Sequence, residues 1–219
     1  MHDLGLVARE FGLASPVLVG YSWGGLLAML YAATARATGL PAPAALLLID
    51  PAPITRQYRE QFEHEFARRQ ASAEVRRLRA ELAASHLRET DPNAYRQRNF
   101  ELSVAGYFAH PSAARDLTPF RVNARVQHSV WDSLGRFDLA TEGRLRAIDA
   151  PTLIVHGRQD PIPLASSEEA ARIMHAKLVV IEDCGHVPYV EQPDALFSAM
   201  DAFLREQRLV SSPRSLSPG

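Results

Sequence analysis

The sequence predicts an α/β protein with a mostly parallel sheet flanked by helices and interrupted by a helical insertion. Short apolar runs alternate with helical patterns at both ends of the chain, which is typical of βαβ units. A long, strongly charged stretch separates these two parts. The serine of the segment GYSWGG stands where the first apolar run gives way to a helical pattern. The elements follow in chain order.

Residues 1–51 form the first part of the predicted α/β core. Apolar residues at helical spacing predict a first helix, and a glycine then ends it. Two wholly apolar runs predict strands that are covered on both faces, with an alanine-rich helix between them. The predicted elements are a helix over 3–12, a strand over 16–22, a helix over 26–37 and a strand over 44–51.

Residues 52–146 are predicted to form the helical insertion. Ten Arg and seven Asp or Glu lie between positions 56 and 98, with apolar residues at roughly helical intervals. This pattern predicts amphipathic helices with solvated outer faces, and a further helix is expected over 127–134. Insertions beside the ligand-binding edge of a sheet commonly act as lids, so we expect a lid that controls substrate choice.

Residues 147–207 again alternate apolar runs with helical patterns, as residues 1–51 do, and they complete the predicted core. The Ser/Pro-rich residues 208–219 are expected to be a disordered tail. The predicted elements are a strand over 151–157, a helix over 166–175, a strand over 177–183 and a closing helix over 194–205.

Composition narrows the functional classes. The 219 residues carry a formal net charge of -1, which gives no bulk attraction to nucleic acid or anionic membranes. No apolar run reaches the roughly 20 residues of a membrane helix. The single cysteine, Cys184, rules out an internal disulfide and fits a reducing compartment. We therefore expect a cytoplasmic protein that binds neither nucleic acid nor membranes.

Ser22 is the candidate nucleophile. Gly20-Tyr21-Ser22-Trp23-Gly24 matches the G-x-S-x-G nucleophile elbow, in which a serine stands on a sharp strand-to-helix turn. Side chains at Gly20 and Gly24 are expected to collide with the neighbouring strand and helix. The hydroxyl would stand at a helix N-terminus, whose dipole favours developing negative charge.

A serine nucleophile needs a base and an acid that orients the base. Asp160 follows the strand over 151–157, and His186 follows the strand over 177–183. The carboxyl ends of parallel strands meet at one sheet edge, so these side chains should face Ser22. Asp50 also follows a strand and is the second choice for the acid.

Other candidate groups receive no catalytic role. His156 ends a strand and is expected to bond loop backbone, while Cys184 at the end of an apolar strand is expected to be packed. The histidines show no H-x-x-x-H spacing, so no zinc site is predicted. We expect neither a metal nor an organic cofactor.

Together these features resemble the α/β-hydrolase superfamily, over residues 1 to about 207. The segments GYSWGG, SVAGYFAHP, RVNARVQHSVWDSLGRFDL and DCGHVPYVEQPDAL are most similar to those of proline iminopeptidase-type serine hydrolases. Esterases, lactonases and carbon–carbon hydrolases share the elbow and the G-H-x-x-x-x-E-x-P run. The resemblance implies that a small-molecule ester, an amide or a short peptide is the substrate. It also implies an acyl-enzyme mechanism with Ser22, His186 and Asp160, and an oxyanion bond from the backbone N–H of Trp23.

Two alternatives remain open at this point. A peptidase would need lid carboxylates for the substrate's ammonium group, and Glu74, Glu81 and Glu101 are available. A non-catalytic or damaged hydrolase-fold protein is the alternative from another class. In the resembling family several strands precede the elbow, whereas Ser22 stands 21 residues after Met1. We therefore expect the first part of the fold to be missing and the strand over 16–22 to be an edge strand.

Overall fold

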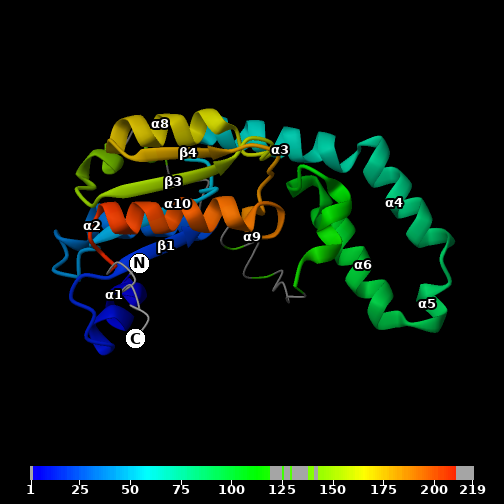
Figure 1. Ribbon diagram of the computed structural model, residues 1–219, viewed down its shortest axis with the longest axis horizontal. Helices are drawn as coiled ribbons and strands as arrows, with labels where there is room; N and C mark the ends of the chain where they lie inside the picture. The colour runs from blue at the N-terminus through cyan, green and yellow to red at the C-terminus, as the bar shows by residue number, and fades with distance from the viewer. Residues whose placement is uncertain (1, 119–124, 126–128, 130–137, 141–142, 211–219) are drawn as a thin grey trace, which may run out of the picture.

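A four-stranded parallel sheet lies at the centre of the computed structural model, which describes residues 2–118, 125, 129, 138–140 and 143–210 (Figure 1). The strands run in the spatial order β1-β2-β3-β4. Each lies within a predicted strand: β1 (Val17–Tyr21), β2 (Ala45–Ile49), β3 (Thr152–Gly157) and β4 (Lys177–Ile181). The predicted α/β class is confirmed.

Helices cover both faces of the sheet (Figure 1). Leu46 and Leu48 of β2 point into a core with α2 and α8, while Leu47 and Ile49 point into a second core with α10. This alternation follows from the period of two along a strand and explains why β2 is apolar throughout. The covering helices are α2 (Trp23–Ala35), α8 (Leu164–Met174) and α10 (Pro193–Glu206). Helix α1 (His2–Glu10) instead packs its Leu4 against a small cluster that contains Tyr31 of α2.

Strand β1 is the edge strand of the described sheet, as expected. Its Val19 side chain is 55% exposed. The expectation of cover on both faces is therefore wrong for β1, although it holds for β2, in which every residue is buried. An apolar composition therefore does not show whether helices cover both faces of a strand.

Helices and 3₁₀ turns also make up most of the described residues between β2 and β3. Side chains cap three of them, because Thr55, Ser72 and Asp91 accept hydrogen bonds from backbone N–H groups of the first turn. The helices are α3 (Arg56–Gln70), α4 (Ala73–Ala84), α5 (Leu87–Thr90) and α6 (Pro92–Val104), with 3₁₀ turns η1 (Ala105–Tyr107), η2 (Pro111–Asp116) and η3 (Arg144–Ala147). The helix predicted over 127–134 and the tail beyond residue 210 lie outside the described residues.

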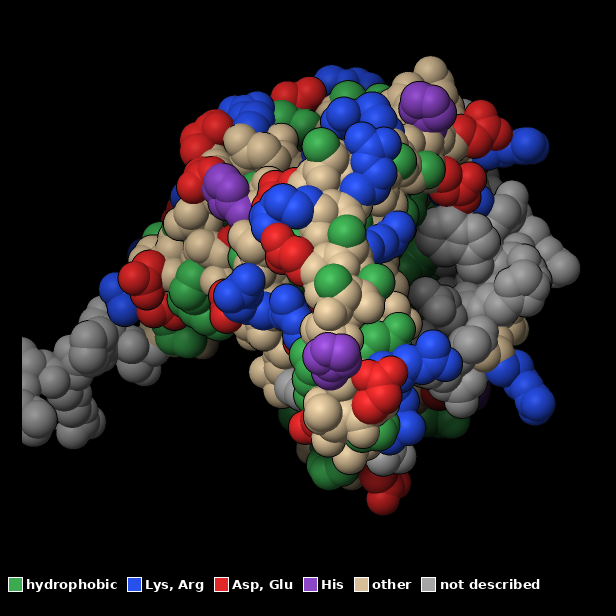
Figure 2. Space-filling model, turned by 90° about the vertical axis from the view of Figure 1, so that its right-hand side faces the viewer, with side chains coloured by type: hydrophobic (Ala, Val, Ile, Leu, Met, Phe, Trp, Pro, Cys, Tyr) green, Lys and Arg blue, Asp and Glu red, His purple; other side chains and the backbone are tan. Residues whose placement is uncertain are grey.

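The charges of these helices form local pairs on the surface. Glu65 bonds both Arg68 and Arg69, and Arg77 pairs with Glu81 one turn away. Figure 2 shows basic and acidic side chains interspersed over the face that looks toward the α4–α6 end. The prediction of solvated outer faces is confirmed. Among the described helices, none combines the length and apolarity of a membrane span.

Candidate active site

Ser22 occupies a strained turn between β1 and α2. Its backbone has φ 52 and ψ -116, a region that non-glycine residues rarely adopt. The Ser22 N–H donates to the Ile49 carbonyl at 2.9 Å, and α2 begins at the next residue, Trp23. The turn thus places the hydroxyl at the positive end of a helix.

The glycines around Ser22 have unequal roles. A Cβ on Gly20 would lie 2.4 Å from the Gly24 carbonyl oxygen, and one on Gly25 would lie 2.9 Å from Cβ of Pro51. A Cβ on Gly24 would meet no atom within 4 Å. The prediction is therefore correct for Gly20 and wrong for Gly24. The close approach falls one residue later, at Gly25, because that residue faces the end of β2.

This difference predicts opposite effects of two matched substitutions. Gly20→Ala should lower the free energy of unfolding by about 1–3 kcal/mol, because the methyl group meets rigid backbone. Gly24→Ala should change it by zero to about 1 kcal/mol in the stabilising direction, because alanine favours a helix over glycine. Denaturant unfolding of the two variants beside the parent measures both. Equal destabilisation would contradict the assigned packing.

Two further side chains meet Ser22 at the carboxyl edge of the sheet. Asp160 lies in the loop between β3 and α8, and His186 lies between β4 and the short helix α9 (Pro188–Glu191). His186 Nε2 is 2.9 Å from Ser22 Oγ, and His186 Nδ1 is 2.7 Å from Asp160 Oδ2. The structure thus brings together the three residues chosen from the sequence.

Burial shapes the electrostatics of this hydrogen-bonded chain. The side chain of Asp160 is fully buried and that of His186 nearly so. Loss of hydration raises the pKa of Asp160 above its usual range, against the lowering effect of its hydrogen bond from the Ile162 N–H, and it lowers the pKa of His186 to about 4. A lowered pKa keeps the imidazole neutral near pH 7, so its Nε2 is able to accept the Ser22 proton.

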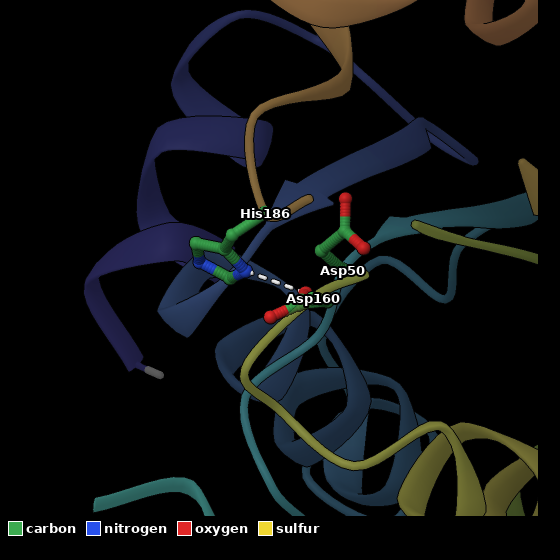
Figure 3. Close-up of side chains that lie close together, drawn as sticks. All are labelled: Asp50, Asp160 and His186. Atoms are coloured by element: carbon green, nitrogen blue, oxygen red, sulfur yellow. Dashed lines mark hydrogen bonds and ion pairs between the residues drawn. The ribbon is translucent and has the colours of Figure 1, made fainter. Parts of the chain in front are cut away.

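Asp50, the second choice for the acid, lies beside this chain but is not hydrogen-bonded to His186 (Figure 3). One ligand atom each of Asp50, Asp160 and His186 lies within 4.8 Å of the others. Among the described residues, these three form the one group of side chains that could hold a metal ion. His186 Nδ1 and Asp160 Oδ2 are already hydrogen-bonded to each other within this group.

The loop that carries His186 is held by the segment between β2 and β3. The His186 N–H donates to the Tyr107 carbonyl at 2.7 Å, and the two rings stack with centroids 4.9 Å apart. The Glu191 carboxylate accepts the N–H groups of Gly185 at 2.7 Å and Ala109 at 2.8 Å. No role was predicted for Tyr107 or Glu191. Both stand in segments that resemble those of known hydrolases, SVAGYFAHP and DCGHVPYVEQPDAL. The Tyr107 carbonyl and the Glu191 carboxylate accept backbone N–H groups, and no residue pattern reports such bonds.

Several other histidine, cysteine and glutamate side chains considered in the sequence are held by contacts outside the Ser22–His186–Asp160 chain. His156 is buried, and its Nε2 bonds the Ile162 carbonyl at 3.1 Å, as expected. Cys184 is fully buried, also as expected, and burial raises the pKa of its thiol. Glu101 bonds Arg98 and Gln97, while Glu81 bonds Arg77.

Ser22 and His186 open onto a cavity of about 290 Å³. Its described lining is otherwise apolar or aromatic and contains no carboxylate. A concave apolar site with a few convergent polar groups is typical of small-molecule binding. The lining side chains include Trp23, Phe100, Val104, Tyr107, Leu117 and Tyr189.

Comparison with protein families gives a match over nearly the whole chain. The model described as "Alpha/beta hydrolase family" matches residues 2–199. Among solved structures, an alpha/beta fold family hydrolase from Bacillus anthracis str. Sterne superposes with a TM-score of 0.64 at 17% identity. That match covers 94% of this chain and 72% of the other, and it shows a shared fold.

Curated relatives match over shorter stretches. "Putative protein-lysine deacylase ABHD14B" of Rattus norvegicus is 28% identical over 104 residues, which are 48% of this chain and 47% of the relative. A pimeloyl-[acyl-carrier protein] methyl ester esterase of Nitrosospira multiformis is 34% identical over 65 residues, 29% of this chain and 25% of the relative. The chain thus spans half or less of these relatives' length.

Proposed function

This chain belongs to the alpha/beta hydrolase family, and from that premise we propose that it hydrolyses small esters through Ser22, His186 and Asp160. The observation that carries the proposal is the hydrogen-bonded chain from Ser22 Oγ through the His186 ring to Asp160. It stands at the wall of an apolar cavity. Membership of the family does not identify the substrate, so we infer the substrate class from the side chains that line the cavity.

In the proposed reaction, His186 Nε2 takes the proton of Ser22 while Oγ attacks the ester carbonyl carbon. Asp160 accepts the His186 Nδ1 proton in a hydrogen bond, which fixes the tautomer and stabilises the imidazolium. The N–H of Trp23, in the first turn of α2, is proposed to donate to the oxyanion. The imidazolium then protonates the leaving alcohol, and water, activated by the same imidazole, releases the acid from Ser22.

The lining of the cavity favours an ester over a peptide with a free N-terminus. A substrate ammonium group in an apolar cavity needs a carboxylate to compensate its lost hydration. None of Glu74, Glu81 and Glu101 is among the described lining residues. We therefore propose an ester with a compact apolar acyl group, and the aminopeptidase alternative becomes the comparison in the test.

The test is a set of p-nitrophenyl esters with acyl chains of increasing length, beside a proline arylamide. We expect turnover of the esters and none of the arylamide. Val104→Phe narrows the cavity and should lower kcat/KM for long acyl chains more than for acetyl, by roughly tenfold. Ser103→Phe places the same side chain on the exposed face of α6 and should preserve the parent preference.

Two results would contradict this proposal in different ways. Faster cleavage of the proline arylamide than of every ester would favour the aminopeptidase. A folded parent chain that turns over neither class of substrate would favour a non-catalytic hydrolase-fold protein.

A further inference from the structure

Asp50 is a buried acid that the proposed reaction leaves unused. It follows β2 with φ 41, and the whole residue is inaccessible to solvent. One carboxyl oxygen, Oδ1, accepts the Gly157 N–H at 2.8 Å. The other, Oδ2, has no hydrogen-bond partner in the described part of the chain. A buried carboxylate with a single donor is costly, so the proton content of Asp50 needs an explanation.

No described cation compensates a charge on Asp50. Nδ1 of His156 is 3.8 Å from Asp50 Oδ1, but burial lowers the pKa of His156 to about 4, so the ring is neutral near pH 7. Its Nε2 must donate to the Ile162 carbonyl, since a carbonyl only accepts. In the neutral ring Nδ1 then carries no proton and accepts the Ser167 hydroxyl at 2.9 Å.

Asp160 is better placed than Asp50 to hold a negative charge. It accepts the Ile162 N–H and the His186 Nδ1–H, both at 2.7 Å. Arg69 also acts favourably on the charge of Asp160. The titratable groups that face Asp50 are Tyr21, His156, Asp160, Cys184 and His186.

Two carboxyl groups this close do not both ionise readily in a dry site. Burial raises the pKa of both. The second charge would meet the first across less than 4.8 Å. One proton is therefore retained by the pair near neutral pH.

We propose that Asp50 carries this proton and donates it to the Asp160 carboxylate, acting as a positioning residue for the acid that orients His186. The pair then holds a single negative charge, on the carboxyl group that contacts the imidazole. Its kinetic consequence rests on the proposed function, whereas the location of the proton does not.

The direct test is infrared spectroscopy of the substrate-free parent chain with ¹³C in the aspartate carboxyl groups. We expect the carbonyl stretch of a protonated aspartic acid at pH 7. It should disappear in Asp50→Asn, whose amide oxygen is able to accept the Gly157 N–H and whose NH₂ is able to replace the proposed donor to Asp160. Absence of the band from the parent, or its persistence in Asp50→Asn, would overturn the proposal. Neither outcome depends on turnover.

Unfolding gives a second readout with a defined sign. A pKa raised in the folded state means that folding takes up a proton above about pH 4, so Asp50 costs stability as pH rises from there toward its folded pKa. Asp50→Asn removes this cost, and its Tm advantage over the parent should grow between pH 5 and pH 8. A pH-independent Tm difference would contradict the assignment.

Turnover rates of two Asp50 variants show whether Asp50 positions Asp160 or only fills space beside it. Asp50→Leu removes the bond to Asp160 and should lower kcat by about 10- to 100-fold, the value of a hydrogen bond to a charged group. Asp50→Asn should recover most of that loss. Failure of asparagine to rescue would overturn the positioning role. An inert parent that still shows the infrared band would refute the proposed function and not the shared proton.

Discussion

Ser22→Ala should lower kcat for the preferred ester by about 10⁶-fold, the scale at which loss of a triad serine acts in other hydrolases. Removal of Oγ deletes the atom that forms the acyl-enzyme and that lies 2.9 Å from His186 Nε2. The rate of p-nitrophenol release, followed by stopped-flow or steady-state absorbance, measures the loss of kcat.

The matched control for this substitution is Ser15→Ala. Ser15 bonds the Ala42 carbonyl at an exposed site away from the cavity, and its variant should turn over at the parent rate. Ester cleavage by Ser22→Ala at more than a hundredth of the parent rate would show that another group carries the reaction.

Asp160→Asn should lower kcat by about 10⁴-fold, with little change in the fold. Asparagine keeps an acceptor for the Ile162 N–H, but its amide donates where the carboxylate accepted. The His186 ring then adopts the other tautomer or loses its partner, and Nε2 no longer accepts from Ser22. The change is a loss of kcat at nearly constant KM, because Asp160 does not line the cavity.

The control is Asp183→Asn, which changes an exposed aspartate that bonds His110 on the surface. It should leave kcat within about twofold, since an exposed ion pair is worth less than about 1 kcal/mol. A larger loss in Asp50→Asn than in Asp160→Asn would show that Asp50 is the orienting acid.

The sequence was sufficient to place the three polar residues at one edge. Ser22, Asp160 and His186 each follow a short apolar run, and parallel strands bring their carboxyl ends together whatever the details of packing. The wholly apolar runs also located every described strand. These features depend on local residue types, which a sequence states directly.

Features that depend on distant contacts were not predictable in the same way. Gly25 rather than Gly24 is in close contact because Pro51 approaches it from the loop after β2. Tyr107 holds His186 through a backbone carbonyl 79 positions earlier in the chain. The unpartnered oxygen of Asp50 becomes visible only when burial and donors are counted in three dimensions.

The central claim, that Ser22 is activated by His186 and Asp160, is tested most directly by mapping a fluorophosphonate adduct. The parent chain is labelled, digested and analysed by mass spectrometry beside Ser22→Ala and Asp160→Asn. We predict one adduct, on the peptide that contains Ser22, with none in Ser22→Ala and much slower labelling in Asp160→Asn. An adduct on another residue, or equal labelling of parent and Ser22→Ala, would contradict the claim.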